Sequence, residues 1–451
     1  MNDIIVAIST SLGKGAISII RLSGEGCIQL VNNHFKGKNL TKVDSHTINY
    51  GYIIDNSKII DQVLISVMKA PKTYTREDVV EINCHGGIAA TNKILELMIL
   101  NGARLAEPGE FTKRAFLNGR IDLVEAEAVM DLINSKTEKA RIQSVNQLEG
   151  RLTNIIRKFR QELLELLANI EVNIDYPEYE DIEVVTIDNI KDKVKEMNTS
   201  LNNIIKESEN RKIIKDGINV AIVGRPNVGK SSILNKLLGE NKAIVTDIAG
   251  TTRDIVEGSI TLNGIELNFI DTAGIRNTED VVEKYGVEKS IEEINKADLV
   301  IFVLNNNEEL TNDDIELINK LKNKKYITVI NKKDLEQKLD ISKYELNNVI
   351  YTDTISMDGI ESLKDKIIEL FNLEEIEQND VDIFTSTRQI TLAKECLPIL
   401  KDVEEGVINN VPVDMVSIDI KRIWTLLGEI LGENYSEELI DQLFSQFCLG
   451  K

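Results

Sequence analysis

The octapeptide GRPNVGKS, at residues 224–231, constrains the fold of this chain more strongly than any other feature. It lies between the apolar segment INVAIV and the segment SSILNKLL, in which apolar residues recur at helical spacing. A glycine-rich turn between a buried strand and a helix is the phosphate-binding loop of P-loop proteins, because its backbone N–H groups converge on phosphate oxygens. The sequence therefore predicts a mainly parallel sheet wrapped by helices, with a nucleotide at this loop.

Side chains of the loop have distinct expected roles. Lys230 is expected to reach the β- and γ-phosphate oxygens, and the hydroxyl of Ser231 is expected to bind Mg²⁺. The residues predicted to contact the nucleotide here are Asn227, Val228, Gly229, Lys230, Ser231 and Ser232.

A second motif, NKKD at residues 331–334, predicts which base is bound. Asp334 offers two acceptor oxygens, which match the N1–H and exocyclic amine donors of guanine. Adenine lacks this pair of donors, so the nucleotide is expected to be GTP. The predicted base contacts are Asn331, Lys332 and Asp334, together with Ser356 and Met357, which stand where related GTPases place Ser-Ala.

The motif DTAG, at residues 271–274, predicts how hydrolysis is organised. Asp271 is expected to hold Mg²⁺ through water, and the N–H of Gly274 to sense the γ-phosphate. Thr252, within GTTRD, is the second predicted hydroxyl on Mg²⁺. GTPases of the Ras kind orient the attacking water with a glutamine, but this chain has Ile275 after the glycine. Another group must therefore position the water.

Two ways of neutralising charge in the transition state remain open at this point. Arg225, Arg253 and Arg276 lie in the nucleotide motifs, and each is a candidate arginine finger. The other candidate is a monovalent cation such as K⁺, which neutral oxygen ligands suit. Asn227 offers one such oxygen, and the segment ENKAIVTDIAGTT is long enough to add backbone carbonyls.

Composition and pattern define the rest of the chain. The net charge of -21 requires any nucleic-acid contact to use a local basic patch. The four cysteines form no CxxC pair, which argues against zinc and disulfides, and no apolar run is long enough for a membrane span. We therefore expect a cytoplasmic protein. Its predicted domains are an α/β domain at 1–118, a helical domain at 119–215 and 382–451, and the P-loop domain inserted at 216–381.

Several segments outside these motifs point to one family. The segments are IIRLSG near the start, NGRIDLVEAEAV in the middle and CLGK at the end, in addition to GTTRD and DTAGIR. With them the chain resembles, essentially from end to end, the MnmE family of tRNA modification GTPases, also called TrmE. The resemblance implies a folate-binding N-terminal domain that mediates homodimerisation, and a Ras-like GTPase domain inserted into a helical domain.

The resemblance also implies roles for residues of the GTPase domain. K⁺ would stimulate dimerisation of the GTPase domains, and Thr246 would also contact GTP. The implied K⁺ ligands are Asn227, the carbonyls of Thr246 and Ile248, and Thr251. Glu283 would orient the attacking water through a second water. From the sequence alone, Glu283 is an acidic residue that opens a helix, where the helix dipole favours a carboxylate.

For the N-terminal domain the resemblance implies a folate site. The cofactor would be 5,10-methylenetetrahydrofolate or its 5-formyl analogue. Its implied ligands are Arg21, Glu81, Arg120 and Lys451. Arg120 is a conservative departure, since the family also has lysine there. Cys448 would be a thiol held beside the one-carbon chemistry and is the candidate catalytic residue of tRNA modification.

The activity implied by the resemblance is GTP hydrolysis that serves tRNA modification. With the FAD-containing partner MnmG, also called GidA, in a heterotetramer or larger complex, the chain would add an aminomethyl or carboxymethylaminomethyl group to C5 of the wobble uridine. The chain itself has no dinucleotide-binding fingerprint, so FAD is assigned to the partner. The alternative is a GTP-switched factor for RNA or ribosome assembly. Against it, the residues after 380 lack the basic character of an RNA-binding domain.

Overall fold

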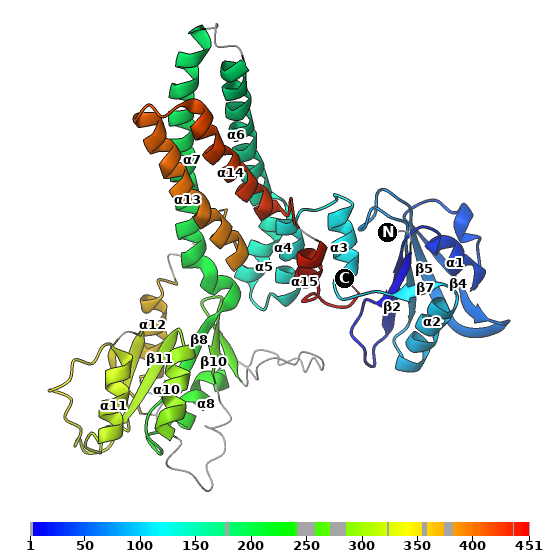
Figure 1. Cartoon of the computed structure of the whole chain (residues 1–451). Helices are drawn as coiled ribbons and strands as arrows, with labels where there is room; N and C mark the ends of the chain where they lie inside the picture. The colour runs from blue at the N-terminus through cyan, green and yellow to red at the C-terminus, as the bar shows by residue number, and fades with distance from the viewer. Residues whose placement is uncertain are drawn as a thin grey trace. The chain divides into compact units, whose positions relative to one another are not determined.

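The structure is a computed structural model, and it describes residues 3–175, 180–240, 258–270, 286–322, 324–353, 359–373, 382–435 and 437–450 (Figure 1). The chain divides into two compact units. The first comprises Met1–Asn134, Ser144–Asn203 and Ser386–Lys451, and the second comprises Ser135–Gln143 and Ile204–Thr385. The predicted division into three domains, at boundaries near residues 118, 215 and 381, stays a prediction.

The first unit contains a seven-stranded sheet in the order β3-β4-β5-β6-β2-β1-β7. Neighbouring strands are antiparallel, except that β1 and β7 are parallel. The strands are β1 (Ile4–Ile8), β2 (Ile17–Ser23), β3 (Phe35–Lys36), β4 (Thr47–Asp55), β5 (Lys58–Met68), β6 (Val79–His85) and β7 (Ala103–Leu105).

One face of this sheet forms a core with the helices α1 (Cys27–Asn33) and α2 (Ile88–Leu100). The core-facing residues alternate along the strands, as Val63, Ile65 and Val67 do in β5. The helix α2 contributes Ile94, Leu97 and Met98, which recur at helical spacing and are buried. A short 3₁₀ helix, η1 (Leu40–Lys42), completes this part of the unit. The predicted α/β class of the N-terminal region is therefore confirmed.

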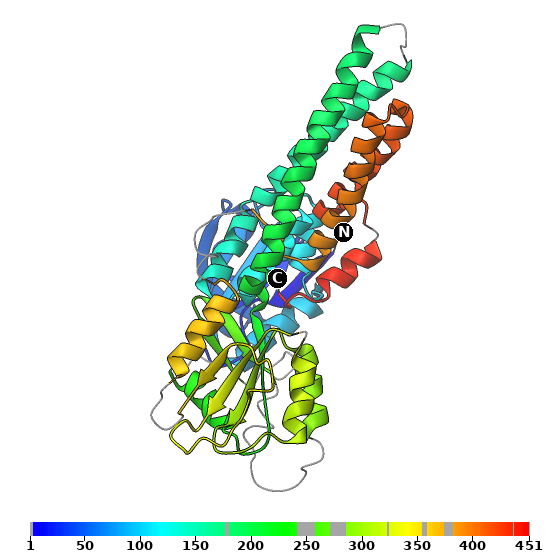
Figure 2. The same ribbon diagram turned by 90° about the vertical axis from the view of Figure 1, so that its left-hand side faces the viewer.

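The remainder of the first unit is helical. Its helices, some of which extend into the second unit, are α3 (Glu110–Leu117), α4 (Leu123–Asn134), α5 (Glu138–Leu148), α6 (Arg151–Asp175), α7 (Glu180–Asp216), α13 (Thr387–Ile408), α14 (Val413–Leu431) and α15 (Glu437–Phe444). α13 and α14 pack as a hairpin, and α14 also packs against α6 (Figure 2). Helices from before and after residues 204–385 thus pack against one another in the first unit.

The apolar stripe of α6 differs by one residue from its predicted form. Spacing in the sequence predicts that Ile155 faces the core, but the structure buries Ile156 and leaves Ile155 half-buried. Both positions fit helical spacing, since Ile155 lies three residues after Leu152 and Ile156 lies four, so spacing alone does not distinguish them.

The second unit contains a six-stranded sheet in the order β13-β12-β11-β8-β10-β9. All neighbours are parallel except β9 and β10. The strands are β8 (Ile218–Val223), β9 (Ser259–Leu262), β10 (Ile265–Phe269), β11 (Leu299–Asn305), β12 (Tyr326–Asn331) and β13 (Val349–Tyr351). The predicted mainly parallel sheet is confirmed.

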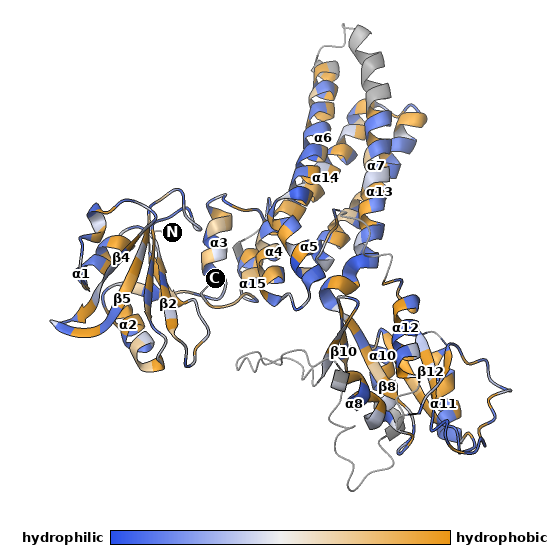
Figure 3. Cartoon of the chain, turned by 180° about the vertical axis from the view of Figure 1, so that it is seen from behind, coloured by the Kyte–Doolittle hydropathy of each residue, from blue (hydrophilic) through white to orange (hydrophobic). Residues whose placement is uncertain are grey.

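Helices cover both faces of this sheet, and they are α8 (Lys230–Glu240), α10 (Gly286–Lys296), α11 (Asn312–Leu321) and α12 (Ile360–Leu370). Alternate residues of β11 enter two separate cores: Ile301 packs with residues of α8 and α12, and Phe302 packs with residues of α10 and α11. Figure 3 shows how strongly apolar the strands of this sheet are. Burial on both faces explains why the sequence of such strands is continuously apolar.

Among the described residues, we find no helix with the length and hydrophobicity that a membrane span requires.

Candidate functional site

The loop of GRPNVGKS joins β8 to α8, and two of its glycines have geometry that no other residue fits. Gly224 and Gly229 have φ values of 148° and 105°. A Cβ atom on Gly224 would lie 2.3 Å from the Val303 carbonyl oxygen, and one on Gly229 would lie 2.0 Å from the Asn331 side-chain nitrogen. The backbone therefore passes close to both β11 and β12. This close approach shapes the phosphate-binding turn that the sequence predicts.

Lys230 is the first residue of α8, and its ammonium group turns back onto the loop. Its Nζ donates hydrogen bonds to the carbonyl oxygens of Gly224 at 2.6 Å and Arg225 at 2.7 Å. Burial lowers the pKa of Lys230 below its ordinary value, partly opposed by the charge of Glu293. The ammonium group is thus held within the loop, where the oxygens of a bound phosphate would stabilise its protonated, charged form.

Asn331 connects the base motif to the phosphate loop. Its Nδ2 donates to the Val228 carbonyl oxygen at 2.9 Å, and its Oδ1 accepts from the Thr352 hydroxyl at 3.2 Å. Asn331 is almost completely buried, so both bonds are shielded from water. The first residue of NKKD therefore fixes the spacing between the loop that binds phosphate and the loop that carries Asp334.

Arg225 has carboxylate partners within its own unit. Its Nε lies 2.8 Å from Oδ2 of Asp314, which is fully buried, and its Nη2 lies 3.1 Å from Oε2 of Glu308. A guanidinium held by two carboxylates anchors the loop to the start of α11, so this geometry favours an anchoring role for Arg225 over that of an arginine finger. Arg253 and Arg276 lie outside the described residues.

Many of the predicted site residues lie outside the described part of the chain. They are Thr246, Ile248, Thr251, Thr252, Asp271, Gly274, Glu283, Ser356, Met357 and Lys451. Their roles stay predictions.

A second candidate site lies on the N-terminal sheet, where Arg21 and Glu81 are directly opposite each other on β2 and β6. The Arg21 Nε donates to Glu81 Oε1 at 2.9 Å, and Nη2 lies 2.8 Å from the same oxygen. Both side chains are about one-fifth exposed. The Arg21 guanidinium also lies 5.7 Å from the centre of the Phe111 ring. The structure thus brings two of the four predicted folate ligands into contact.

The C-terminal segment lies against this pair. The Gly450 carbonyl oxygen accepts hydrogen bonds from Ser9 Oγ at 3.0 Å and from Arg21 Nη1 at 3.3 Å. The Gly109 N–H donates to the Cys448 carbonyl oxygen at 3.1 Å, and the Cys448 side chain is exposed. Gly450 is buried, and a Cβ atom there would lie 2.4 Å from the Ile8 carbonyl oxygen. Residues 448–450 are therefore docked beside Arg21.

Arg120 has different neighbours. Its Nη1 donates to the Tyr74 carbonyl oxygen at 3.3 Å, and its guanidinium lies 4.8 Å from the centre of the Tyr74 ring. Tyr74 in turn shares a 3.0 Å hydrogen bond with the Thr112 hydroxyl. Within the described ranges, no hydrogen bond or ion pair joins Arg120 to Arg21 or Glu81. The segment around Tyr74 holds Arg120.

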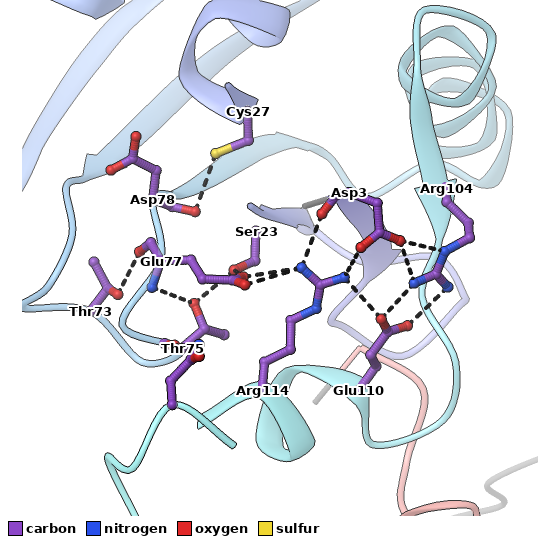
Figure 4. A network of polar contacts seen from close by, with 11 residues as sticks. Asp3, Ser23, Cys27, Thr73, Thr75, Glu77, Asp78, Arg104, Glu110 and Arg114 are labelled. Carbon is purple, nitrogen blue, oxygen red and sulfur yellow. Dashed lines mark hydrogen bonds and ion pairs between the residues drawn. The ribbon is translucent and has the colours of Figure 1, made fainter. Parts of the chain in front are cut away.

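An ion network centred on the buried Arg114 fixes that segment, as Figure 4 shows. Arg114 is 1% exposed and pairs with Asp3 at 2.7 Å, Glu77 at 3.2 Å and Glu110 at 3.1 Å. Arg104 pairs with both Asp3 and Glu110. Removal of one member would leave charge uncompensated, so the network tightly ties α3 to the loop before β6.

Two carboxylates of this network, Asp3 and Glu110, are stabilised in their charged form. Burial alone would raise the pKa of Asp3 and of Glu110, but hydrogen bonds from Arg104 and the nearby Arg114 outweigh it and lower both pKa values. Sequence reasoning missed the network, because its members are separated by tens of residues and follow no recognisable motif.

Comparisons with known proteins cover the whole chain. Residues 4–120 match the family described as the GTP-binding protein TrmE N-terminus, and residues 123–448 match the MnmE helical domain. The tRNA modification GTPase MnmE of Bacillus thuringiensis (strain Al Hakam) is 52% identical, over 100% of this chain and 99% of the relative. The protein of the same name from Staphylococcus epidermidis (strain RP62A) is 51% identical, over 100% and 99% of the two chains.

Similar solved structures cover smaller parts of the chain. The G domain of the T. maritima FeoB iron transporter is 26% identical and covers 34% of this chain and 98% of its own, with a TM-score of 0.25. Era in complex with MgGDPNP and a 16S ribosomal RNA fragment is 28% identical and covers 40% of this chain and 66% of its own, with a TM-score of 0.26.

Proposed function

The chain belongs to the MnmE family of tRNA modification GTPases, and on this premise we propose that it uses a one-carbon tetrahydrofolate to modify the wobble uridine of tRNA. It is a GTP hydrolase acting in tRNA modification. The proposed product carries an aminomethyl or carboxymethylaminomethyl group on C5. The observation that carries this proposal is the Arg21–Glu81 pair with the C-terminal segment docked beside it.

The chemistry of a pterin suits this pair. A pterin presents a pair of N–H donors like that of guanine, and a carboxylate with a free oxygen can accept from them. Both contacts from Arg21 to Glu81 use Oε1, and Oε2 has no partner among the described residues. Glu81 can therefore accept from the pterin without releasing Arg21. Arg120 and Lys451 supply further positive charge for the remaining polar and anionic groups of the cofactor.

When bound, 5,10-methylenetetrahydrofolate or its 5-formyl analogue supplies the one-carbon unit. The proposed role of this chain is to hold the cofactor through Arg21 and Glu81 and to keep the thiol of Cys448 near it. The redox chemistry is assigned to the FAD of the partner MnmG, in a heterotetramer or larger complex.

The folate site can be tested by titrating the protein with 5-formyltetrahydrofolate. Arg21→Ala is expected to weaken binding by about 10- to 150-fold, the value of one charge-assisted hydrogen bond. Lys93→Ala, which removes an exposed cation of α2, is the matched control and is expected to bind normally. A wild-type protein that does not bind the folate, or an Arg21→Ala protein that binds it equally well, would contradict the assignment.

In the GTPase domain we assign Mg²⁺ to Ser231 and Thr252. We assign K⁺ to Asn227, Thr251 and the carbonyls of Thr246 and Ile248, and the positioning of the attacking water to Glu283. The anchored state of Arg225 supports a cation in place of that arginine. Asn227 is exposed in the loop, with φ of 62°.

Replacement of Na⁺ by K⁺ is expected to raise GTP turnover steeply, because K⁺ would both neutralise charge and draw two GTPase domains together. Asn227→Ala is expected to lose most of this stimulation. Steady-state phosphate release in matched chloride salts measures both effects. Equal rates in Na⁺ and K⁺ would remove the cation from the mechanism.

An apolar surface on the N-terminal sheet supports the proposed homodimer. On the face opposite the helices, Ile48, Tyr50 and Leu64 are 70%, 58% and 45% exposed, and Tyr50 and Leu64 are cross-strand partners. Exposed apolar side chains that gather on one sheet face are typical of an interaction surface.

Leu64→Asp is expected to weaken the homodimer more than about tenfold, since it replaces an apolar contact by a charge that must be buried. Leu100→Asp is the matched control, because Leu100 is 73% exposed at the end of α2. Light scattering coupled to size exclusion gives the oligomeric state. A Leu64→Asp dimer as stable as wild type would exclude this face as the interface.

A further inference from the structure

Asn306 directly follows β11 and makes four hydrogen bonds to the segment that carries the base motif. Its backbone N–H donates to the Asn331 carbonyl oxygen at 2.9 Å, and its own carbonyl oxygen accepts from the N–H groups of Lys338 at 2.9 Å and Leu339 at 3.1 Å. Its side-chain Nδ2 donates to the Leu335 carbonyl oxygen at 3.0 Å. The residue is 4% exposed, so these bonds are protected from competing water.

These contacts lie on both sides of Asp334. Asn331 precedes it and Leu335 follows it, whereas the carboxylate of Asp334 is exposed and has no hydrogen bond or ion pair among the residues described. Elsewhere in the turn, the Lys333 N–H donates to the Thr352 carbonyl oxygen at 3.1 Å. The direction of the Asp334 carboxylate is therefore set by its backbone, and Asn306 donates a side-chain hydrogen bond to the carbonyl of the next residue, Leu335.

We propose that Asn306 is a positioning residue that determines base specificity. Its side-chain amide holds the Leu335 carbonyl, which belongs to the peptide joining Leu335 to Glu336. This bond restrains the backbone one residue after Asp334, so that Asp334 presents both oxygens to the base. The two parallel hydrogen bonds from the base to the Asp334 carboxylate require that the carboxylate be held in one orientation. If the loop is less rigid, one of these two bonds is lost before the other. This proposal rests on the proposed role of Asp334 in recognising guanine.

Asn307 offers a matched control within the same segment. Its backbone N–H donates to Asn305 Oδ1 at 3.1 Å, but among the described residues its side chain makes no hydrogen bond to Leu335. Asn307→Ala therefore replaces the same residue type at the adjacent position, but it leaves the hydrogen bond between Asn306 and the Leu335 carbonyl oxygen intact.

The test compares the affinities of GDP and inosine diphosphate, which lacks the exocyclic amine of guanine. The wild type is expected to prefer GDP by about 10- to 100-fold, the value of one hydrogen bond to a charged group. In Asn306→Ala this preference is expected to fall to within about threefold, because GDP affinity falls while that of inosine diphosphate changes little. Asn307→Ala is expected to keep the wild-type preference.

Asn306→Asp is a second variant that preserves the shape of the side chain but places an oxygen against the Leu335 carbonyl, and the same loss of preference is expected. If the affinities for both nucleotides fall equally in these variants, Asn306 only supports the fold and the proposal is wrong.

Asp334→Ala distinguishes the positioning role of Asn306 from the guanine-binding role of Asp334. Loss of the GDP preference in Asp334→Ala, but not in the Asn306 variants, would overturn the positioning role alone. An unchanged preference in Asp334→Ala would instead overturn the role of Asp334 itself.

Discussion

Replacement of Lys230 by alanine is expected to lower GTP turnover by about 10²- to 10³-fold, the usual effect of removing one donor from a site of developing charge. The Lys230 ammonium is held 2.6 Å from the Gly224 carbonyl oxygen, inside the loop where the phosphates are expected to bind. Burial lowers the pKa of Lys230, because the charged ammonium group loses its hydration. Phosphate oxygens bound in the loop would replace that lost hydration. Alanine removes both the positive charge and the long side chain that carries it to the phosphates.

Lys236→Ala is the control for this prediction, because Lys236 is on the same helix but outside the phosphate loop. Its turnover is expected to match that of the wild type. GTP binding, measured by titration, and single-turnover phosphate release separate a loss of affinity from a loss of chemistry. A Lys230→Ala protein with turnover near the wild-type rate would mean that this loop is not the hydrolytic site.

The GTPase domain was predictable from the sequence because its signals are local. GRPNVGKS was expected between a strand and a helix, and the structure has β8 end at Val223 and α8 begin at Lys230. The strands beside it are continuously apolar because both of their faces are buried, and this pattern identifies a parallel sheet without any knowledge of the strand order.

The order of the strands and the assembly of the second site depend on contacts between distant parts of the chain. Arg21 and Gly450 are 429 residues apart, and no pattern within either segment predicts their hydrogen bond. The Arg21–Glu81 pair was expected only through the resemblance, since a strand-end acid and an isolated arginine carry no signal of their own. Only the register of β2 against β6 places them opposite each other.

Positioning residues were the hardest to predict. Arg114 is a basic residue in an amphipathic helix, and its near-complete burial among three carboxylates follows from the packing of α3. Asn306 lies in a run of three asparagines that the sequence indicates as a polar turn. Its contacts with Leu335 and Asn331 exist because parallel strands end at the same edge of the sheet.

Family membership also decides between the two functions that the sequence left open. Relatives about half identical over the full chain are tRNA modification GTPases, and the match extends through the N-terminal and helical regions. A GTP-switched assembly factor would share only the nucleotide motifs. In the proposed function, the Arg21–Glu81 pair and the docked C-terminal segment would form the folate site of the regions outside the GTPase domain.

Loss of the gene is expected to remove the aminomethyl-type group from the wobble uridine of the affected tRNAs nearly completely. A wild-type copy is expected to restore it, whereas Lys230→Ala is not, because GTP hydrolysis would drive the modification. Cys448→Ser separates the two activities, since Cys448 is in the first unit, whereas the phosphate loop is in the second. That variant is expected to hydrolyse GTP normally without supporting modification, and normal modification would leave Cys448 only a packing role.

The measurement that tests the central claim most directly is therefore nucleoside analysis, by mass spectrometry, of tRNA from cells that lack this gene. The proposed function predicts wobble uridines without the C5 substituent, and their recovery when the wild-type gene is returned. Wobble uridines that remain fully modified in the absence of the gene would contradict it.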